Sequence, residues 1–243
     1  MKRPGRLYAG TSGFSYTSWV PRFYAPGKVS RKLLPAYAAR LPAVELNNTF
    51  YRRPSDQQVA KWLAETPAHF RFCPKAQRGT SWRAWSEDDP ADSIAWLTTA
   101  LTGFGERLGC VLLSVLGSLE RDDLKLERIL RAWPVDVPLA LELPHPSWDA
   151  DEVHAQLRDH GVSLVATDWD DRAEPDLRRI GSFLYLRLRR AAYSEADLQR
   201  WAQRLEPFIA DGMDAFVFLR HDQDGTSALQ AERLIRLVGK ARG

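Results

Sequence analysis

The sequence predicts an α/β fold: a closed, parallel (β/α)8 barrel of the TIM-barrel type, formed by a single domain over residues 1–243. Three observations predict it. Eight short apolar segments rich in Leu, Val and Phe alternate with amphipathic stretches of helical periodicity. The apolar segments are bounded by Gly, Pro, Asp or Asn, as buried parallel strands usually are. A chain of this length is also typical of such barrels.

The predicted strands are short runs, bounded by residues that end strands. In chain order they are Leu7–Ser12, Ala43–Asn47, Phe70–Lys75, Cys110–Val115, Leu139–Leu143, Ser163–Asp168, Phe183–Leu188 and Ala215–Leu219.

The predicted helices show apolar residues at a spacing of three and four. They are Arg31–Arg40, Asp56–Glu65, Ala91–Leu101, Arg121–Ala132, Asp151–His160, Glu195–Asp211 and Ser227–Val238. Ser55, Asp149 and Ser194 have side chains suited to helix N-caps, the last with Asp197 at the third helical position. His160-Gly161 is typical of a helix end.

One connection leaves an alternative open. The segment after Asp168 is acidic and has no helical periodicity, which is compatible with an open, doubly wound sheet that binds a nucleotide in a crevice. Against this alternative, no Gly-rich phosphate loop follows the first predicted strand.

Composition excludes several classes of protein. No apolar run approaches the ~20 residues that span a bilayer, and the first residues lack the apolar core of a signal peptide. Cys73 and Cys110 form no zinc or disulfide pattern, so we expect a cytoplasmic protein. The net charge of +3 conceals an asymmetry, because residues 1–83 carry 15 basic and three acidic residues. Such an excess favours an anionic partner. The oligomeric state is not indicated.

Polar residues stand at the carboxyl ends of the predicted strands, where barrel enzymes carry their active sites. On four strands a small residue shares the inward parity of the polar one: Gly10 with Ser12, Cys73 with Lys75, Ala140 with Glu142, and Ala166 with Asp168. We therefore expect a pocket at this end of the barrel, with Glu142 and Asp168 close together on neighbouring strands.

The leading functional hypothesis is an enzyme that acts on a small or terminal phosphate- or carboxylate-bearing substrate. The candidate catalytic residues are Glu45, Lys75, Glu142 and Asp168. The carboxylates would serve as acid and base or hold a divalent cation, although no dense metal motif is present. Lys75 would stabilise charge, or in a variant form a Schiff base. The candidate substrate-binding residues are Ser12, Asn47, Tyr51, Arg187, Arg189 and Arg220. Lys75, Arg187 and Arg189 would either neutralise the carboxylates or bind the phosphate or carboxylate of the substrate.

Two further hypotheses remain open. Aromatic residues after the first three strands lie among basic ones, an arrangement that binds single-stranded nucleic acid. The basic residues concerned are Arg22, Lys28, Arg52, Arg53, Arg78 and Arg83. The third hypothesis is a non-catalytic scaffold, which a pocket filled by its own side chains would favour.

These residues resemble the YecE-like family (domain of unknown function 72) over nearly the whole chain. Two specific motifs carry the resemblance: Gly10–Tyr16 with Trp19 and Phe23-Tyr24, and Val44–Arg52. Further matches are Phe70–Phe72, Lys75-Ala76, Glu142, His145–Trp148, Ala166–Asp168 and Tyr185–Arg187. The resemblance implies a TIM-barrel-like fold and a cytoplasmic protein of a family without an established activity.

The second half departs from the family pattern. Pro144 stands where the family has Arg, and Ser114–Gly117 replaces a Gln-x-Pro-Pro pattern. Arg187–Arg190 replaces Arg-x-His-Gly, and Phe218–Arg220 replaces Phe-x-Asn. These departures indicate either a different ligand or a copy that has lost the ancestral activity.

Overall fold

The computed structural model describes residues 3–27 and 32–240. Lys28, and Arg31 at the start of a predicted helix, lie outside the described residues. The strands are β1 (Leu7–Thr11), β2 (Ala43–Leu46), β3 (Arg71–Pro74), β4 (Val111–Ser114), β5 (Leu139–Glu142), β6 (Ser163–Asp168), β7 (Phe183–Leu188) and β8 (Asp214–Leu219). The helices are α1 (Leu33–Ala38), α2 (Asp56–Ala64), α3 (Arg78–Ser86), α4 (Ala91–Leu101), α5 (Asp123–Ala132), α6 (Asp151–Asp159), α7 (Glu195–Ala210) and α8 (Thr226–Lys240).

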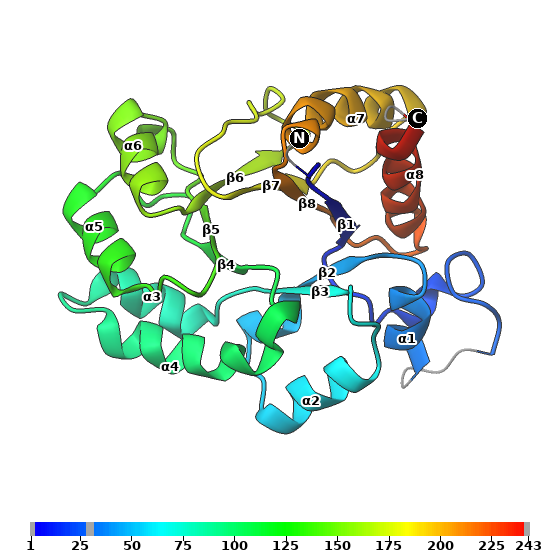
Figure 1. The fold of residues 1–243 in the computed structure, drawn as a ribbon, viewed down its shortest axis with the longest axis horizontal. Coiled ribbons are helices and arrows are strands. Elements are labelled where there is room, and N and C mark those ends of the chain that lie inside the picture. Colours follow the sequence, from blue (N-terminus) through cyan, green and yellow to red (C-terminus); the bar gives the residue numbers. More distant parts are fainter. Residues whose placement is uncertain (1–2, 28–31, 241–243) are drawn as a thin grey trace.

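The strands form two parallel sheets rather than one closed barrel. Six strands pair in the order β1-β8-β7-β6-β5-β4, and β2 pairs with β3 in a separate sheet (Figure 1). The prediction of a closed eight-stranded barrel is therefore wrong: the six-stranded sheet is curled and open. Among the described residues, isolated bridges are the only backbone pairing between the two sheets. Ser12 pairs with Glu45 on one side, and Phe72 with Leu108 and Lys75 with Leu112 on the other.

A tyrosine hydroxyl interrupts pairing between β1 and β2. The backbone N–H of Thr11 donates to Tyr37 Oη at 2.8 Å, and the Tyr37 hydroxyl donates to the Ala43 carbonyl at 3.0 Å. Gly10 permits this approach, because a Cβ at that position would lie 2.0 Å from the same carbonyl oxygen. A side chain thus substitutes for part of the backbone ladder.

A proline interrupts pairing between β3 and β4. Arg71 and Lys75 donate their backbone N–H groups toward β2, to Pro42 and Leu46, whereas Ala76 donates toward β4, to Leu112. By this alternation the nitrogen of Pro74 faces β4, where it has no hydrogen to donate. One ladder bond is therefore missing at this seam.

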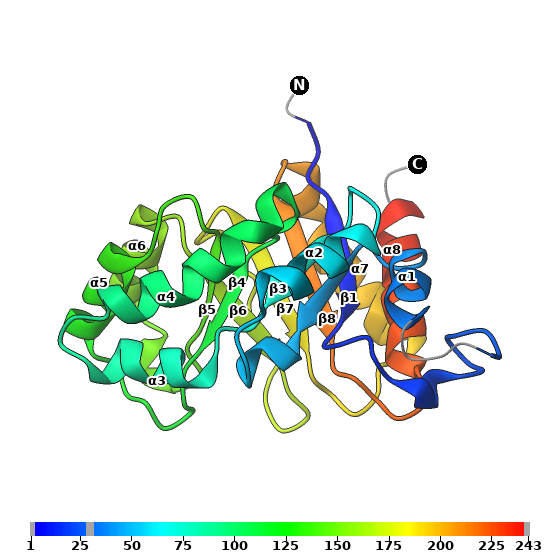
Figure 2. The same cartoon turned by 90° about the horizontal axis from the view of Figure 1, so that it is seen from below.

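The main core lies between the strands and the surrounding helices (Figure 2). A second apolar cluster lies on the inner side of the strands; it includes Tyr8, Ala43, Leu112, Tyr185 and Phe218.

Val165 belongs to the inner cluster as well, which fixes the parity of β6. The inward residues of this strand are Val165 and Thr167, so the expectation that Ala166 and Asp168 face inward is wrong. Alternation along β6 places these two on the opposite face.

Helix ends follow local sequence at most predicted positions. Ser55 and Ser194 cap α2 and α7 through their side chains, and Ser194 forms a capping box with Asp197. The predicted cap at Asp149 is wrong, because α6 begins after Ala150. Gly161, at a φ of 67°, follows the end of α6 as expected.

Between β6 and β7 the chain has no helix, in agreement with the missing periodicity after Asp168. Elsewhere in the described ranges, no helix has the length and apolar character that crossing a membrane would require.

Candidate functional site

Charged side chains from β2, β5 and β7 meet on the inner side of the strands at their carboxyl ends. Arg187 Nη1 donates to both carboxylate oxygens of Glu142 at 2.8 Å. The same guanidinium donates to Glu45 through Nε at 3.1 Å and Nη2 at 3.0 Å. Arg189, just beyond β7, donates to Glu45 at 2.7 Å. We call Glu45, Glu142, Arg187 and Arg189 the inner ion network.

Glu45 is the most enclosed member, with no exposed surface. Its carboxylate also accepts hydrogen bonds from Ser12 Oγ at 2.6 Å and from the Tyr185 hydroxyl at 2.8 Å. Burial alone would raise the pKa of Glu45, but the charges of Arg187 and Arg189 overcome this effect and hold the pKa well below its ordinary value.

The carboxylate of Glu142 likewise accepts hydrogen bonds from neighbouring hydroxyl groups. It accepts from Ser114 Oγ at 2.7 Å and from Thr167 Oγ1 at 2.8 Å. Burial opposes ionisation, yet the charge of Arg187 and these hydrogen bonds lower the pKa of Glu142. Both carboxylates are consequently ionised at neutral pH, where neither has a proton to donate, and the two arginines balance their charge.

Lys75 adds a positive charge beside this balanced network. It follows β3, and its Nζ lies 4.7 Å from the centroid of the Phe50 ring. Nζ makes no hydrogen bond or ion pair with any residue that the structure describes. Burial and the positive charge of Arg187 lower the pKa of Lys75, outweighing the opposite effect of Glu142 and Glu45.

A cavity of about 810 Å³ opens next to Lys75, at the carboxyl ends of β3 and β4. We call it the Lys75 cavity. Its apolar wall comprises Phe50, Trp82, Trp85, Val115, Leu116 and Leu119, and its polar wall Lys75, Arg78, Gly79, Ser81, Ser86, Ser114 and Lys125. None of these lining residues is acidic, and α3 begins at this wall with Arg78 and Gly79. A helix N-terminus adds positive potential, so the cavity suits an anion.

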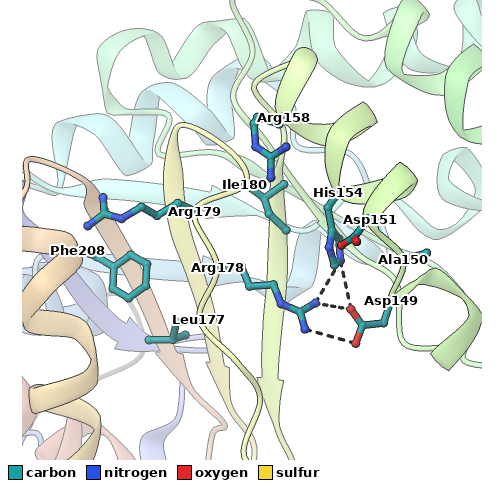
Figure 3. Close-up of a pocket in the computed structure, with 10 residues that line it drawn as sticks. All are labelled: Asp149, Ala150, Asp151, His154, Arg158, Leu177, Arg178, Arg179, Ile180 and Phe208. Atoms are coloured by element: carbon teal, nitrogen blue, oxygen red, sulfur yellow. Dashed lines mark hydrogen bonds and ion pairs between the residues drawn. The ribbon is translucent and has the colours of Figure 1, made fainter.

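A second cavity, of about 790 Å³, lies on the outer side of the molecule between α6 and α7 (Figure 3). It occupies the region where the connection between β6 and β7 has no helix. Two of its arginines already have acidic partners. Arg178 bonds to Asp149 (Figure 3) and lies 3.3 Å from Asp176, and Arg179 lies 2.9 Å from Asp211. We therefore regard the Lys75 cavity as the stronger candidate site.

Five of the predicted site residues lie together in the structure, and a sixth lies next to them. Glu45, Glu142, Arg187, Arg189 and Ser12 form one hydrogen-bonded group, and Lys75 lies beside it.

Asp168 does not join this group. It is buried on the other face of β6, where its carboxylate accepts from Arg190 Nε and from the Tyr193 hydroxyl, each at 2.9 Å. The expected contact between Glu142 and Asp168 is therefore absent, and Thr167 takes its place.

Three predicted binding residues lie outside the network. Asn47 begins a short 3-10 helix after β2. Tyr51 is 76% exposed and packs edge-on against Phe50. Arg220 contacts the network only through the carbonyl of Arg189, at 3.3 Å. Over the described part of the chain, no group of three or more His, Cys, Asp or Glu residues could hold a metal ion.

Sequence reasoning missed α3, which carries one wall of the cavity. None of the predicted helices includes Trp82 or Trp85. The buried residues Ser81, Ala84 and Trp85 follow helical spacing, and Gln77 caps the helix by accepting from the backbone of Thr80. This spacing was the available signal. Tyr185 and Thr167, which bond to the two carboxylates, were also missed.

Comparison with known proteins now identifies the family. The model of the family "Protein of unknown function DUF72" matches residues 8–243. The chain belongs to the DUF72 family. It is 28% identical over 149 residues to UPF0759 protein YunF of Bacillus subtilis, covering 58% of this chain and 52% of that protein. It is 26% identical over 168 residues to UPF0759 protein YecE of Escherichia coli K12, covering 67% and 59% respectively. The matches thus span between one half and three fifths of the length of these relatives.

Solved structures of DUF72 proteins share the fold. A DUF72 protein of Thermotoga maritima superposes with a TM-score of 0.84 at 25% identity, covering 96% of this chain and 99% of the other. A DUF72 protein of Enterococcus faecalis gives a TM-score of 0.77 at 17% identity, covering 96% and 95%. The names of these relatives give no reaction, so the function must be argued from the site.

Proposed function

We propose that this DUF72 protein is an enzyme whose substrate is a small or terminal organic anion, bound in the Lys75 cavity through a phosphate or carboxylate group. One observation carries the proposal: the Lys75 ammonium group, which has no ion-pair partner among the described residues, borders a cavity whose lining has no acidic residue. A buried or half-buried charge is costly when unpaired. An anionic ligand would supply the missing partner.

In this proposal the four neighbouring cations have two different roles. Lys75 and Arg78 contact the anionic group, since both line the cavity. Arg187 and Arg189 do not, because their guanidinium groups are committed to Glu45, Glu142 and Ser12. The carboxylates thus hold the arginines in place, and their low pKa values argue against a role as general acids at neutral pH.

The apolar wall indicates the rest of the ligand. Trp82 is 64% exposed and Phe50 lies over the Lys75 ammonium. Aromatic side chains at such a position stack on flat, weakly polar groups. A ligand with a ring or an extended apolar part next to its anionic group therefore fits better than inorganic phosphate alone.

The test is a binding titration with phenyl phosphate and inorganic phosphate, measured by calorimetry. We expect phenyl phosphate to bind more tightly, and Lys75→Gln to weaken its binding by about tenfold to a hundredfold, since a charge-assisted hydrogen bond contributes roughly 1.5–3 kcal/mol. Lys61→Gln, which alters an exposed lysine of α2, is the matched control. Equal affinities of wild type and Lys75→Gln would contradict the proposal.

Two exposed aromatic rings near the cavity favour a second candidate, the end of a single-stranded nucleic acid. Tyr51 and Trp82 offer surfaces for stacked bases. This candidate requires oligonucleotide binding that weakens steeply with salt, because phosphate contacts release counterions. A salt-independent affinity, or none at low salt, would exclude it.

We also propose a cytoplasmic location. Cys73 and Cys110 are both buried and free, although their Sγ atoms lie only 3.8 Å apart. Thiols that are close together and remain reduced are typical of a reducing compartment.

A further inference from the structure

Lys75 differs from the other cations that line its cavity. Lys125 has a counter-ion, Asp122, at 3.7 Å, and the guanidinium of Arg78 is not a nucleophile at any ordinary pH. Lys75 is therefore the amine of this cavity that has neither an ion-pair nor a hydrogen-bond partner in the described ranges. An amine without such a partner can present its nitrogen to a bound molecule.

The surroundings of Lys75 lower its pKa and so shift its protonation equilibrium toward the neutral amine. Removal from water disfavours the ammonium form, and the charge of Arg187 adds to this effect. Glu142 and Glu45 would counteract both, but Arg187 bonds directly to each of them. Enzymes activate lysine nucleophiles by these two means, desolvation and a neighbouring cation.

The backbone holds Lys75 firmly at the end of its strand. Its N–H donates to the Leu46 carbonyl at 3.1 Å, and its own carbonyl accepts from Thr49 Oγ1 at 2.7 Å. Ala76 next to it donates to Leu112 at 2.8 Å. In this structure these hydrogen bonds fix the position of the backbone from which the side chain extends toward Phe50.

We propose that Lys75 is a catalytic nucleophile that forms an imine with a small aldehyde or ketone carrying a phosphate or carboxylate group. This inference rests on the proposed function, since Arg78 would hold the anionic group. The amine nitrogen adds to the carbonyl carbon to give a carbinolamine, which loses one water molecule as the C=N bond forms. No oxidant or reductant takes part. The protonated imine then withdraws electrons from the neighbouring carbon, as required for cleavage or elimination next to a carbonyl group.

Borohydride trapping tests this step with a probe that combines an aldehyde, a ring and a phosphate. The full chain is incubated with pyridoxal 5′-phosphate, reduced with borohydride, and digested for peptide mass spectrometry. Pyridoxal, which lacks the phosphate, is the matched probe. We expect the stable adduct to form on Lys75 before Lys61 or Lys125, and pyridoxal to label Lys75 more slowly.

Variants separate the amine from the anion site. Lys75→Arg keeps the positive charge, so it should retain phenyl phosphate binding and lose the adduct. Arg78→Gln should slow labelling by pyridoxal phosphate about tenfold, the effect of losing roughly 1.4 kcal/mol of binding, and leave labelling by pyridoxal unchanged. Lys61→Arg should leave the Lys75 adduct unchanged, and circular dichroism checks that each variant is folded.

The possible outcomes distinguish the imine proposal from the proposed function. Adducts spread evenly over the exposed lysines, with phenyl phosphate still bound in a Lys75-dependent manner, would overturn the imine and leave the proposed function standing. Absence of both the adduct and phenyl phosphate binding would overturn the two together. A preferred adduct at Lys75 that the phosphate accelerates would support both.

Discussion

Arg187 links two carboxylates that come from different sheets. Its guanidinium bonds to Glu45 on β2 and to both oxygens of Glu142 on β5. Within the network every charge has a partner of opposite sign, so the removal of one charge leaves another buried and unpaired. Such a loss is far more costly than the net contribution of the intact pair.

We therefore expect Arg187→Met to lower the free energy of unfolding by about 3–5 kcal/mol, the usual cost of breaking a buried pair. Urea denaturation measures this loss. Adding Glu142→Gln to the same chain should recover part of it, because one unpaired carboxylate is removed. If the double variant is less stable than Arg187→Met alone, the network is not the cause.

The same carboxylates should make the free energy of unfolding depend on pH in the acid range. Both Glu45 and Glu142 have pKa values lowered from 4.5 on folding. A lowered pKa contributes stability that is complete above the unfolded value and declines as the pH falls through the folded value. Wild type should thus lose stability below about pH 4.5.

Unfolding curves recorded from neutral pH into this acid range test the effect. Glu142→Gln should show a shallower dependence on pH than wild type, because one titrating group is gone. Parallel profiles for the two proteins would contradict the assigned direction of the Glu142 pKa.

Sequence reasoning found most of the network at this scale, because strand-end position and parity identify inward polar residues. It failed at Asp168, because β6 mixes apolar and polar residues on both of its faces and the pattern does not distinguish them. It also left two roles open for Arg187 and Arg189, neutralising the carboxylates or binding an anionic group, and could not decide between them. That pairing depends on how the strands are staggered, which no local pattern records.

Among the elements, α1 has a role beyond packing, since it delivers Tyr37 to the seam between β1 and β2. Replacing Tyr37 by Phe leaves a buried N–H of Thr11 and a carbonyl of Ala43 without this partner. We expect a loss of about 1–3 kcal/mol in unfolding free energy, the cost of an unsatisfied buried group. Thermal or urea unfolding measures it.

Tyr51→Phe is the control for this variant, since the Tyr51 side chain is exposed and its loss of a hydroxyl should change stability by less than about 0.5 kcal/mol. A similar cost in both variants would show that the seam does not depend on the Tyr37 hydroxyl.

The strands themselves were predictable to within a residue or two at each end, because buried parallel strands leave a strong apolar signal. The helix α3 was missed, since its Arg, Gly, Ser and Trp residues give little amphipathic contrast beyond the spacing of its buried residues. Closure of the barrel was also beyond local patterns. At the two seams the structure has a tyrosine hydroxyl from α1 and a proline without an N–H, and local patterns reveal neither arrangement.

At the scale of the whole molecule, the excess of basic residues in the first third of the sequence lies next to the candidate site. The basic segment 1–83 includes β1, β2 and β3 and reaches into α3, so it supplies Lys75 and Arg78 to the cavity. A positive potential at the entrance of a site increases the association rate of anionic ligands and weakens as salt is added. The asymmetry is thus a property of one sector that borders the site.

The two incomplete seams also have a consequence for motion. The β2–β3 sheet has regular pairing only within itself, and isolated bridges connect it to both neighbours. Few backbone bonds therefore need to break before it separates locally. In hydrogen–deuterium exchange we expect the amides of β2 and β3 to exchange faster than those of β7 and β8. Glu45 and Lys75 belong to this less protected unit, so its opening would release the ion network and the reactive amine together.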